Sequence, residues 1–408
     1  MARFSTLLAL CAAATAATAS PVVVRDSPVS LPLARRVAFT GSAKIVEQDQ
    51  ARAQLLKNVG HGKGAQSKRA APDVQAVNEL TYYTVQVGVG SPPTTYNLIV
   101  DTGSSNTFIG VSKKYVKTST SKDTGSSVSV SYGSGHFSGE QYTDTIKLGS
   151  LTIKNQGISV ANQSSGFPSS IDGILGVGPT QLTKGTVSNG QLIPTVVDNA
   201  FKQGLISAQS IGISYEPATN ASTPNGLLTF GGADSSRFTG DINYLPITAT
   251  SPASQYVGID QAIRYGDNTP ILSKTAGIVD SGTTLILLAT DAFNAYQKAT
   301  GAVLDKTTGL LKITKEQYNK LRCLYFTLGG VDYEFIPNAQ IWPRSLNTVL
   351  GGDKDSIYLV VADLGSKSGE GLDFINGYAW LERFYHTYDS HWNLAGFATT
   401  KFSKRNIN

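Results

Sequence analysis

Two copies of one short motif hold the residues best suited to chemistry. IVDTGSSNTFIG covers residues 99–110 and IVDSGTTLILLA covers residues 278–289, which places Asp101 and Asp280 at matching positions 179 residues apart. Each aspartate follows an apolar segment typical of a buried strand end, and Gly103 permits the tight turn that must come next. One such loop is commonly no more than a turn stabilised by its aspartate. Two matching loops predict that the carboxylates meet, because a lone buried carboxylate is costly.

Two carboxylates that face each other define one kind of reaction. At a separation of about 3 Å they cannot both be ionised, so the pair holds one proton at moderately acid pH. The ionised member can deprotonate a water held between them, while the protonated member hydrogen-bonds to a carbonyl oxygen. The motif pair therefore predicts hydrolysis by general acid–base catalysis, with no covalent intermediate and no cofactor or metal.

The rest of the chain predicts a mainly β fold around these loops. From about Glu79 onward, alternating apolar and polar residues are separated by turns rich in Gly and Pro, as in proteins built of short strands. Residues 128–140, VSVSYGSGHFSGE, alternate and then bend after Tyr132, which predicts a hairpin. Short helices are expected at 194–203, 290–299 and 315–320.

The motif repeat also predicts how the lobes are arranged. Each copy is followed by an apolar segment with glycine, at 173–176 and at 375–377. Repetition of strand, loop and apolar segment indicates two similar lobes produced by duplication, with a cleft between them. We expect an N-terminal lobe over residues 70–245 and a C-terminal lobe over residues 246–408.

The first 69 residues resemble a leader and a removable segment. Residues 1–19 combine Arg3, an apolar stretch and the small-residue sequence Ala17-Thr18-Ala19, which is typical of a secretory signal peptide. Residues 20–69 would then be a propeptide with a helix over 43–57. A Gly-rich linker ends it at the dibasic pair Lys68-Arg69, a suitable processing site. These features predict a secreted, extracellular protein, with a vacuolar location as the alternative.

Charge and composition exclude several classes of partner. Residues 20–69 hold nine basic and three acidic residues, whereas the chain from Ala70 onward has a net charge of −2. The basic character thus belongs to the segment that is removed, and no basic stripe indicates nucleic-acid binding. The apolar run within residues 1–19 is too short to span a bilayer, and no other stretch approaches the length required, so no membrane span is expected. Cys323 is the single thiol after the leader, and the scattered histidines suggest no metal site.

These residues together resemble the pepsin-type aspartic proteases, family A1, and in particular their secreted fungal members. The resemblance extends over nearly all of residues 80–401 and includes both loops, the tyrosine hairpin, Gly173-Ile174-Leu175-Gly176 and LTFGGAD at 228–234. It implies a bilobal fold and an acid-acting endopeptidase, and the shared proton described above is the known behaviour of this family. It also implies extended protein or peptide substrates with large apolar residues around the cut, inhibition by pepstatin-like compounds, and a monomeric enzyme.

The resemblance implies a role for each site residue. Asp101 and Asp280 would be catalytic. Thr102 and Ser281 would lock the two loops together, while Ser104 and Thr283 would hydrogen-bond the outer carboxylate oxygens. The remaining expected site residues allow backbone approach or bind substrate: Gly103, Gly282, the flap residues Tyr132, Gly133 and Ser134, and the pocket residue Ile174.

Three positions depart from the family pattern. Phe108 stands where a tryptophan usually donates its NH to the flap tyrosine, and phenylalanine has no such donor. Asn376 replaces a usual leucine in the second apolar segment. Cys323 occupies a usual disulfide position, but its partner is missing.

Other functions fit the residues less well. An inactive binding or inhibitor protein of the same fold would be marked by a lost aspartate, a broken flap or missing loop hydroxyls. This sequence keeps both aspartates, the flap sequence and the loop hydroxyls. A serine hydrolase would need a G-x-S-x-G turn, which is not present near a strand-to-helix turn. Glycosidase carboxylates stand roughly 5–9 Å apart, unlike two symmetric loops meeting at one water.

Finally, we expect a basic side chain from residues 57–69 to reach the aspartate pair in the precursor and to inhibit it.

Overall fold

The computed structural model describes residues 28–38, 45–61, 80–132, 135–220 and 222–408. The expected signal peptide, the pair Lys68-Arg69 and the flap residues Gly133 and Ser134 lie outside the described residues. The described elements are mainly strands, as predicted. In the first part of the chain they are β1 (Val29–Ala38), α1 (Ile45–Gly60), β2 (Leu80–Val89), β3 (Thr94–Asp101), β4 (Thr107–Ile109), β5 (Lys122–Tyr132), β6 (Gly135–Leu148), β7 (Leu151–Ser165), β8 (Gly173–Gly176), α2 (Val196–Lys202), β9 (Ser210–Tyr215), β10 (Ser222–Phe230) and β11 (Thr239–Pro246).

The second part of the chain continues with short strands and three short helices. They are β12 (Gly258–Tyr265), β13 (Thr269–Val279), β14 (Ile286–Leu288), α3 (Thr290–Thr300), β15 (Val303–Leu304), β16 (Leu311–Ile313), α4 (Lys315–Asn319), β17 (Leu324–Leu328), β18 (Val331–Phe335), β19 (Ile357–Tyr358), β20 (Val361–Asp363), β21 (Phe374–Asn376), α5 (Tyr378–Leu381), β22 (Phe384–Asp389) and β23 (Leu394–Thr399). The helices predicted at 194–203, 290–299 and 315–320 are confirmed as α2, α3 and α4 to within a few residues.

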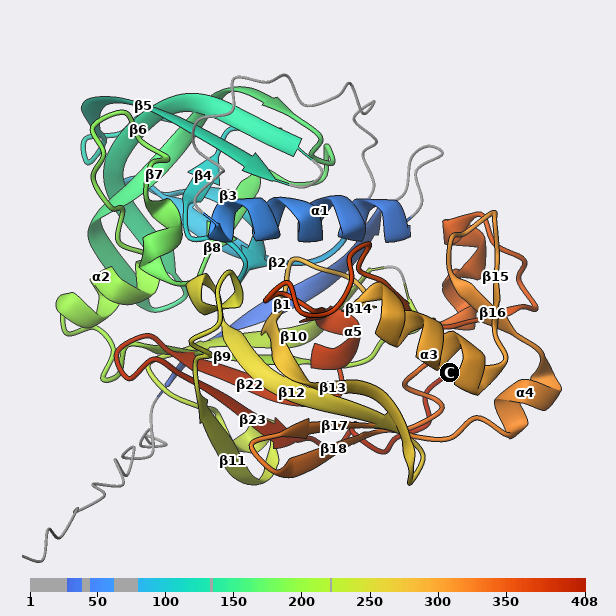
Figure 1. The fold of residues 1–408 in the computed structure, drawn as a ribbon. Coiled ribbons are helices and arrows are strands. Elements are labelled where there is room, and N and C mark those ends of the chain that lie inside the picture. The colour runs from blue at the N-terminus through green and yellow to red at the C-terminus, as the bar shows by residue number, and fades with distance from the viewer. Residues whose placement is uncertain (1–27, 39–44, 62–79, 133–134, 221) are drawn as a thin grey trace, which may run out of the picture.

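One large sheet joins the two halves of the molecule. Its described strands follow the order β11-β23-β22-β9-β10-β1-β2-β3-β8-β4-β7-β6-β5, so β22 and β23 from the end of the chain pair with β9 and β11. A second sheet of seven strands, β18-β17-β12-β13-β21-β14-β20, forms most of the other half. In Figure 1 the β5–β7 layer lies at the top, the second sheet lies below, and α1 runs between them.

The internal repeat of the sequence is also a repeat of structure. β3 pairs in parallel with β8, and β4 pairs antiparallel to the same strand. In the same way, β13 pairs in parallel with β21, and β14 pairs antiparallel to it. The register sets Asp101 opposite Gly176 and Val279 opposite Asn376. The two aspartate loops therefore leave equivalent strand ends, as duplication predicts.

The β5–β6 hairpin shows how the sequence pattern places its side chains. Val128 and Tyr132 are buried, whereas Ser129 and Ser131 are exposed, because successive strand residues point to opposite faces. The predicted alternation of residues 128–132 is confirmed. Tyr132 ends β5 and faces inward at the tip of this hairpin.

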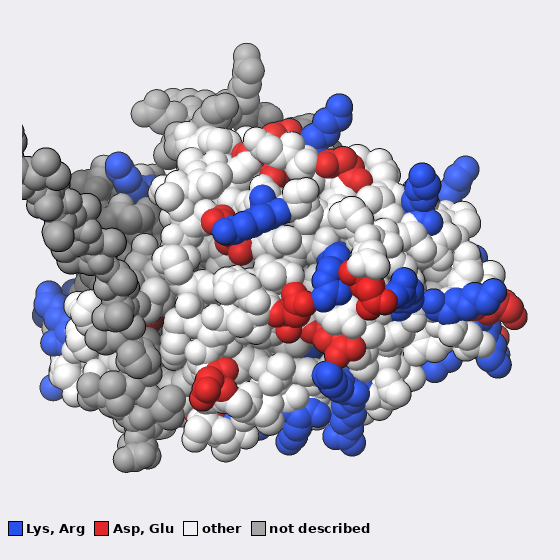
Figure 2. Space-filling model, turned by 60° about the horizontal axis from the view of Figure 1, so that its bottom comes forward, with Lys and Arg blue, Asp and Glu red and all other residues white. Residues whose placement is uncertain are grey.

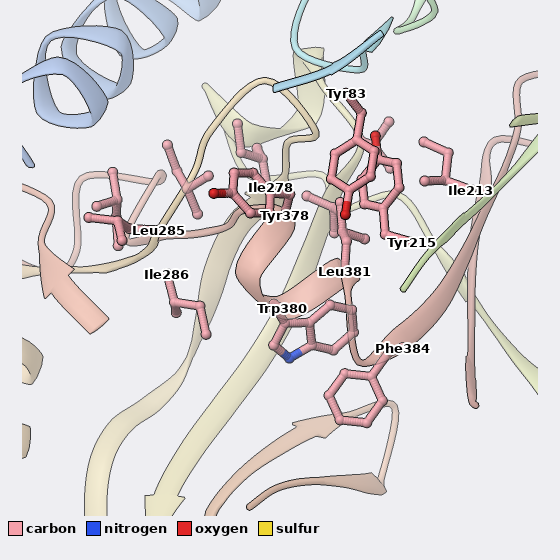
Figure 3. Packing of buried hydrophobic residues seen from close by; sticks show 14 of the residues in the cluster. Tyr83, Ile213, Tyr215, Ile278, Leu285, Ile286, Tyr378, Trp380, Leu381 and Phe384 are labelled. Carbon is pink, nitrogen blue, oxygen red and sulfur yellow. The ribbon is translucent and has the colours of Figure 1, made fainter. Parts of the chain in front are cut away.

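A continuous apolar core supports both loops from below. Figure 3 shows Tyr83 beside Tyr215, with Tyr378 and Trp380 of α5 nearby. The Tyr83 and Tyr215 rings stack with centroids 3.6 Å apart, and Trp380 packs on Phe384 at 4.6 Å. Because such packing leaves few voids, the strands that carry the aspartates are held rigidly.

The surface is only sparsely charged, as expected when charged residues are 15% of the chain. On the face shown in Figure 2, most atoms of the described part belong to uncharged residues, and blue and red side chains lie next to one another. Among the described helices, none has both the length and the apolar character needed to cross a bilayer.

Candidate active site

The two aspartate loops are tied together by a reciprocal pair of hydrogen bonds. The backbone NH of Thr102 donates to Ser281 Oγ at 3.0 Å, and the NH of Ser281 donates to Thr102 Oγ1 at 2.9 Å. Each hydroxyl then donates onward to a carbonyl, Thr102 to Val279 and Ser281 to Val100. The structure thus brings Thr102 and Ser281 together in the crossed arrangement that the family resemblance implied.

Each carboxylate has its own matching set of donors. Ser104 Oγ donates to Asp101 Oδ2 at 2.5 Å, and Gly103 NH donates to Oδ1 at 3.0 Å. Thr283 Oγ1 donates to Asp280 Oδ2 at 2.5 Å, and Gly282 NH donates to Oδ1 at 3.1 Å. Both aspartates are buried, at 1% and 0% exposure.

The two glycines are needed because the loops approach each other closely. A Cβ atom on Gly103 would lie 2.7 Å from Asp280 Oδ1, and one on Gly282 would lie 2.6 Å from Asp101 Oδ1. Any larger residue at either position would collide with the opposite carboxylate. The sequence prediction for these glycines therefore has a clear steric reason.

Arg52 of helix α1 occupies the space between the carboxylates. Its Nη2 lies 2.5 Å from Asp101 Oδ1 and 2.9 Å from Asp280 Oδ1, while Nε lies 2.6 Å from Asp280 Oδ2. The guanidinium is therefore forked on Asp280 and bridges to Asp101. The expectation that residues 57–69 would supply this cation is wrong. Lys57, on the same helix, instead reaches Glu370.

The pKa values of the two aspartates are shifted in opposite directions, although the Arg52 guanidinium acts to lower both. Burial acts to raise the pKa of Asp280, but the charge and hydrogen bonds of Arg52 outweigh it and hold that pKa below its ordinary value. Burial raises the pKa of Asp101 above its ordinary value, against the attraction of Arg52 and with the repulsion of Asp280 added. In this state Asp280 is the carboxylate and Asp101 is the member that accepts a proton more readily.

A second side chain of α1 is anchored beside the dyad. Asp49 is 3% exposed and accepts hydrogen bonds from the backbone NH groups of Thr284 and Leu285, at 3.2 and 2.8 Å. Burial raises the pKa of Asp49 to about 7, although both NH groups and Arg52 oppose the shift. Helix α1 therefore contacts the second loop through a carboxylate as well as a cation.

The pocket next to the dyad is largely apolar on the N-terminal-lobe side. Tyr132 and Ile174, both predicted as substrate-binding residues, line it together with Tyr82, Ile99 and Phe167. Gln48, Asp49 and Arg52 close it from the α1 side. Helix α1 thus covers this pocket.

Tyr132 is packed among aromatic rings, and the residue at position 108 is Phe, which has no NH to donate to it. Phe108 stacks on Phe137 at 4.1 Å and also contacts Tyr132 and Phe167, with centroids 5.7 and 5.3 Å away. The buried Tyr132 hydroxyl lies near Ser104 but forms no well-aligned hydrogen bond with a described residue. The Tyr132 side chain is therefore held by ring packing.

The other departures from the family pattern are also accommodated locally. Asn376 is buried and exchanges two amide hydrogen bonds with Gln261, at 2.9 and 3.2 Å. A polar residue is therefore tolerated at this buried position. Cys323 is a free thiol whose Sγ lies 3.2 Å from Glu334.

Sequence reasoning missed Arg52, Asp49, Tyr82 and Phe167. Arg52 and Asp49 lie inside the helix predicted at 43–57, and their spacing of three residues places them on one face. That spacing could have suggested a shared contact. Nothing in the sequence indicates that Tyr82 and Phe167 meet at the pocket, because they are 85 residues apart.

This geometry is that of an aspartic protease, and the comparisons with known proteins agree. Residues 82–400 match the family model of the eukaryotic aspartyl proteases, so the chain belongs to that family. It is an aspartic-type endopeptidase with the bilobal pepsin-like fold.

Fungal relatives cover most of the chain. Polyporopepsin from Irpex lacteus is 60% identical over 341 residues, which are 83% of this chain and all of the relative. The crystal structure of the aspartic proteinase from Irpex lacteus matches with a TM-score of 0.81 and 52% identity, covering 94% of this chain and all of that one. Rhizopuspepsin-1 from Rhizopus niveus is 32% identical, covering 85% of this chain and 90% of the relative.

Proposed function

We propose that the chain is the precursor of a secreted, acid-acting endopeptidase whose catalytic pair is Asp101 and Asp280. The observation that carries this is the facing pair of buried carboxylates, each with the same set of donors and joined by the Thr102–Ser281 cross-bonds. A water between them would be deprotonated by the ionised member. The protonated member would hydrogen-bond the scissile carbonyl oxygen and assist its conversion to a tetrahedral intermediate.

The same proposal makes residues 20–69 an inhibitory propeptide. Arg52 fills the position that the water and the scissile carbonyl would need, and Asp49 takes two backbone donors beside it. The family model begins only at residue 82, beyond this segment. The net charge of +6 on residues 20–69 complements the −2 of the remainder, which favours docking.

The propeptide also takes part in the large sheet. Strand β1 lies between β10 and β2 and pairs with both. Arg35 of this strand is buried, donates to the carbonyl of Ala218 at 2.6 Å and lies 3.6 Å from Glu382. Removal of the propeptide would therefore free a strand position as well as the cleft.

The proposed substrates are proteins and peptides bound in an extended conformation, with large apolar residues flanking the cut. The pocket formed by Tyr132, Ile174, Tyr82 and Phe167 supports this preference. Pepstatin-type inhibitors would bind across the same cleft. The mature enzyme is proposed to act as a monomer outside the cell, without nucleic-acid or membrane partners. A vacuolar location is the alternative, because one relative is the vacuolar protease A of Aspergillus fumigatus.

The test compares wild type with Asp101→Asn and Asp280→Asn after activation at acid pH. Both variants should fold, because asparagine retains the shape of aspartate, and both should lose peptide hydrolysis by several orders of magnitude. Ser281→Thr serves as the control, since it keeps the loop hydroxyl. Substantial hydrolysis by either folded asparagine variant would contradict the dyad, and a wild type without any hydrolysis or pepstatin binding would support an inactive binding protein instead.

A further inference from the structure

The side chain of Lys57 lies in a small site on the rim of the cleft. Its Nζ donates to Glu370 Oε2 at 2.9 Å and also contacts Ser366 Oγ. Lys57 is 6% exposed, whereas the Glu370 side chain is 52% exposed. A removable helix has thus placed a buried ammonium group on a carboxylate and a hydroxyl of the C-terminal half.

Hydrogen bonds within the C-terminal half hold the backbone of the loop that carries this site. Ser368 donates to Asp291 through its NH and its hydroxyl, at 2.9 and 2.6 Å. The NH groups of Gly369 and Glu370 donate to Asp373 at 2.8 and 3.1 Å. None of these bonds involves the propeptide, so the backbone that carries Glu370 stays in place when α1 leaves.

We propose that Glu370 and Ser366 form a cation-binding subsite of the mature cleft, which accepts a lysine or arginine side chain of the substrate. The proposal rests on the proposed function, in which α1 vacates the cleft. Lys57 then indicates which side chain the subsite binds, because its ammonium group donates there to one charged acceptor and one neutral acceptor. The net charge of −2 on the chain from Ala70 onward adds a weaker, general attraction for cationic peptides.

The helix also indicates how far the subsite lies from the cut. Arg52 marks the dyad and Lys57 follows five residues later, a rise of about 7.5 Å along an α-helix. An extended peptide covers that distance in about two residues, at roughly 3.3 Å each. Because the two side chains also point about 140° apart around the helix, this is a lower bound, and the basic residue should stand at least two positions from the scissile bond.

The experiment uses the full-length precursor, activated at acid pH, and a set of peptides with one fixed cleavage site. At each position from four before to four after the cut, lysine is compared with norleucine, which has a similar length and no charge. Rates are expressed as the ratio of kcat/KM for the two peptides, so the amount of active enzyme cancels. Wild type is compared with Glu370→Gln and with Glu316→Gln, an exposed carboxylate on α4, at pH 5 and at two salt concentrations.

We expect lysine to be favoured about two- to fivefold at one position at least two residues from the cut, as for a partly exposed ion pair. Glu370→Gln should abolish the preference, Glu316→Gln should keep it, and added salt should reduce it. A ratio near one at every position, or a preference that survives Glu370→Gln, would overturn the subsite. Hydrolysis of the norleucine peptides by wild type tests the proposed function separately. If the enzyme is not an endopeptidase, these peptides stay intact, whereas if only the subsite is wrong, they are still cleaved.

Discussion

Replacing Arg52 by methionine in the precursor should open the cleft without cleavage of the chain. Methionine keeps much of the apolar stem but removes the cation that bridges the two carboxylates. The Arg52 side chain is only 12% exposed and makes three contacts of 2.5–2.9 Å with them. The docked helix would then leave two carboxylates buried without a counter-charge.

The size of the effect follows from this burial. Removing one partner of a buried ion pair costs about 3–5 kcal/mol. We take the lower end, because Asp101 and Asp280 can relieve part of the repulsion by sharing a proton. A cost of about 3 kcal/mol weakens docking of α1 roughly 150-fold, at 1.36 kcal/mol for each factor of ten.

The pH at which the precursor converts should shift as well. The pKa of Asp280 is lowered in the docked state, so its ion pair with Arg52 stabilises docking above the ordinary carboxyl pKa of about 3.9. This stabilisation disappears as the pH falls through the lowered pKa, so wild type should convert only at about pH 4 or below. Arg52→Met lacks the ion pair and should convert at higher pH.

The assay measures initial hydrolysis of a fluorogenic peptide by intact precursor at pH 5, with mass spectrometry before and after to confirm that the chain is uncut. Arg52→Lys keeps the charge but not the fork and should give an intermediate rate. Arg237→Met removes an arginine that is 32% exposed and pairs with Glu216 on the surface, so it should behave like wild type. If Arg52→Met stays inactive at pH 5 and converts at the wild-type pH, Arg52 does not hold the helix in the cleft.

Three further predictions concern stability. Burial raises the pKa of Asp49 to about 7, above the ordinary value of about 3.9. The folded precursor therefore binds more protons than the unfolded chain between these two values, so stability is lost as the pH rises towards 7 and levels off above it. The Tm of the precursor should fall between pH 5 and 7, and Asp49→Asn should remove that fall, whereas an unchanged fall would exclude Asp49 as its cause. Burial lowers the pKa of His386 to about 4, so between pH 6.5 and 4 the unfolded chain binds more protons than the folded chain. About 3 kcal/mol of stability should therefore be lost as the pH falls over that range. His386→Phe should reduce the corresponding drop in Tm, and an equal drop would refute this. Thr102→Val should cost about 1–3 kcal/mol because it leaves the buried NH of Ser281 without an acceptor, and calorimetry showing no lower Tm would contradict the cross-bond's role.

Local patterns and duplication were enough to predict much of this protein from its sequence. The mainly β fold follows from alternating residues and turns, and the short helices follow from local composition. The sequence also indicated the pairing of Asp101 with Asp280, because two copies of a loop at equivalent strand ends must face each other in a duplicated fold. Gly103 and Gly282 could be assigned from the same motif, whereas the steric reason for them, a collision with the carboxylate of the opposite loop, is seen only in the tertiary structure.

Which cation reaches the dyad was decided only by the tertiary structure. Composition showed that residues 20–69 are basic and helical in part, but it could not say how the helix is rotated in the cleft. Five residues along a helix turn a side chain by about 140° and move it about 7.5 Å, so Arg52 and Lys57 meet entirely different partners. The aromatic cluster around Phe108 and the pocket of Tyr82 and Phe167 were likewise decided by the tertiary structure, because their residues come from several separate segments of the chain. The sequence determines each strand, turn and helix through local chemistry, whereas the contacts between them depend on how the whole core packs.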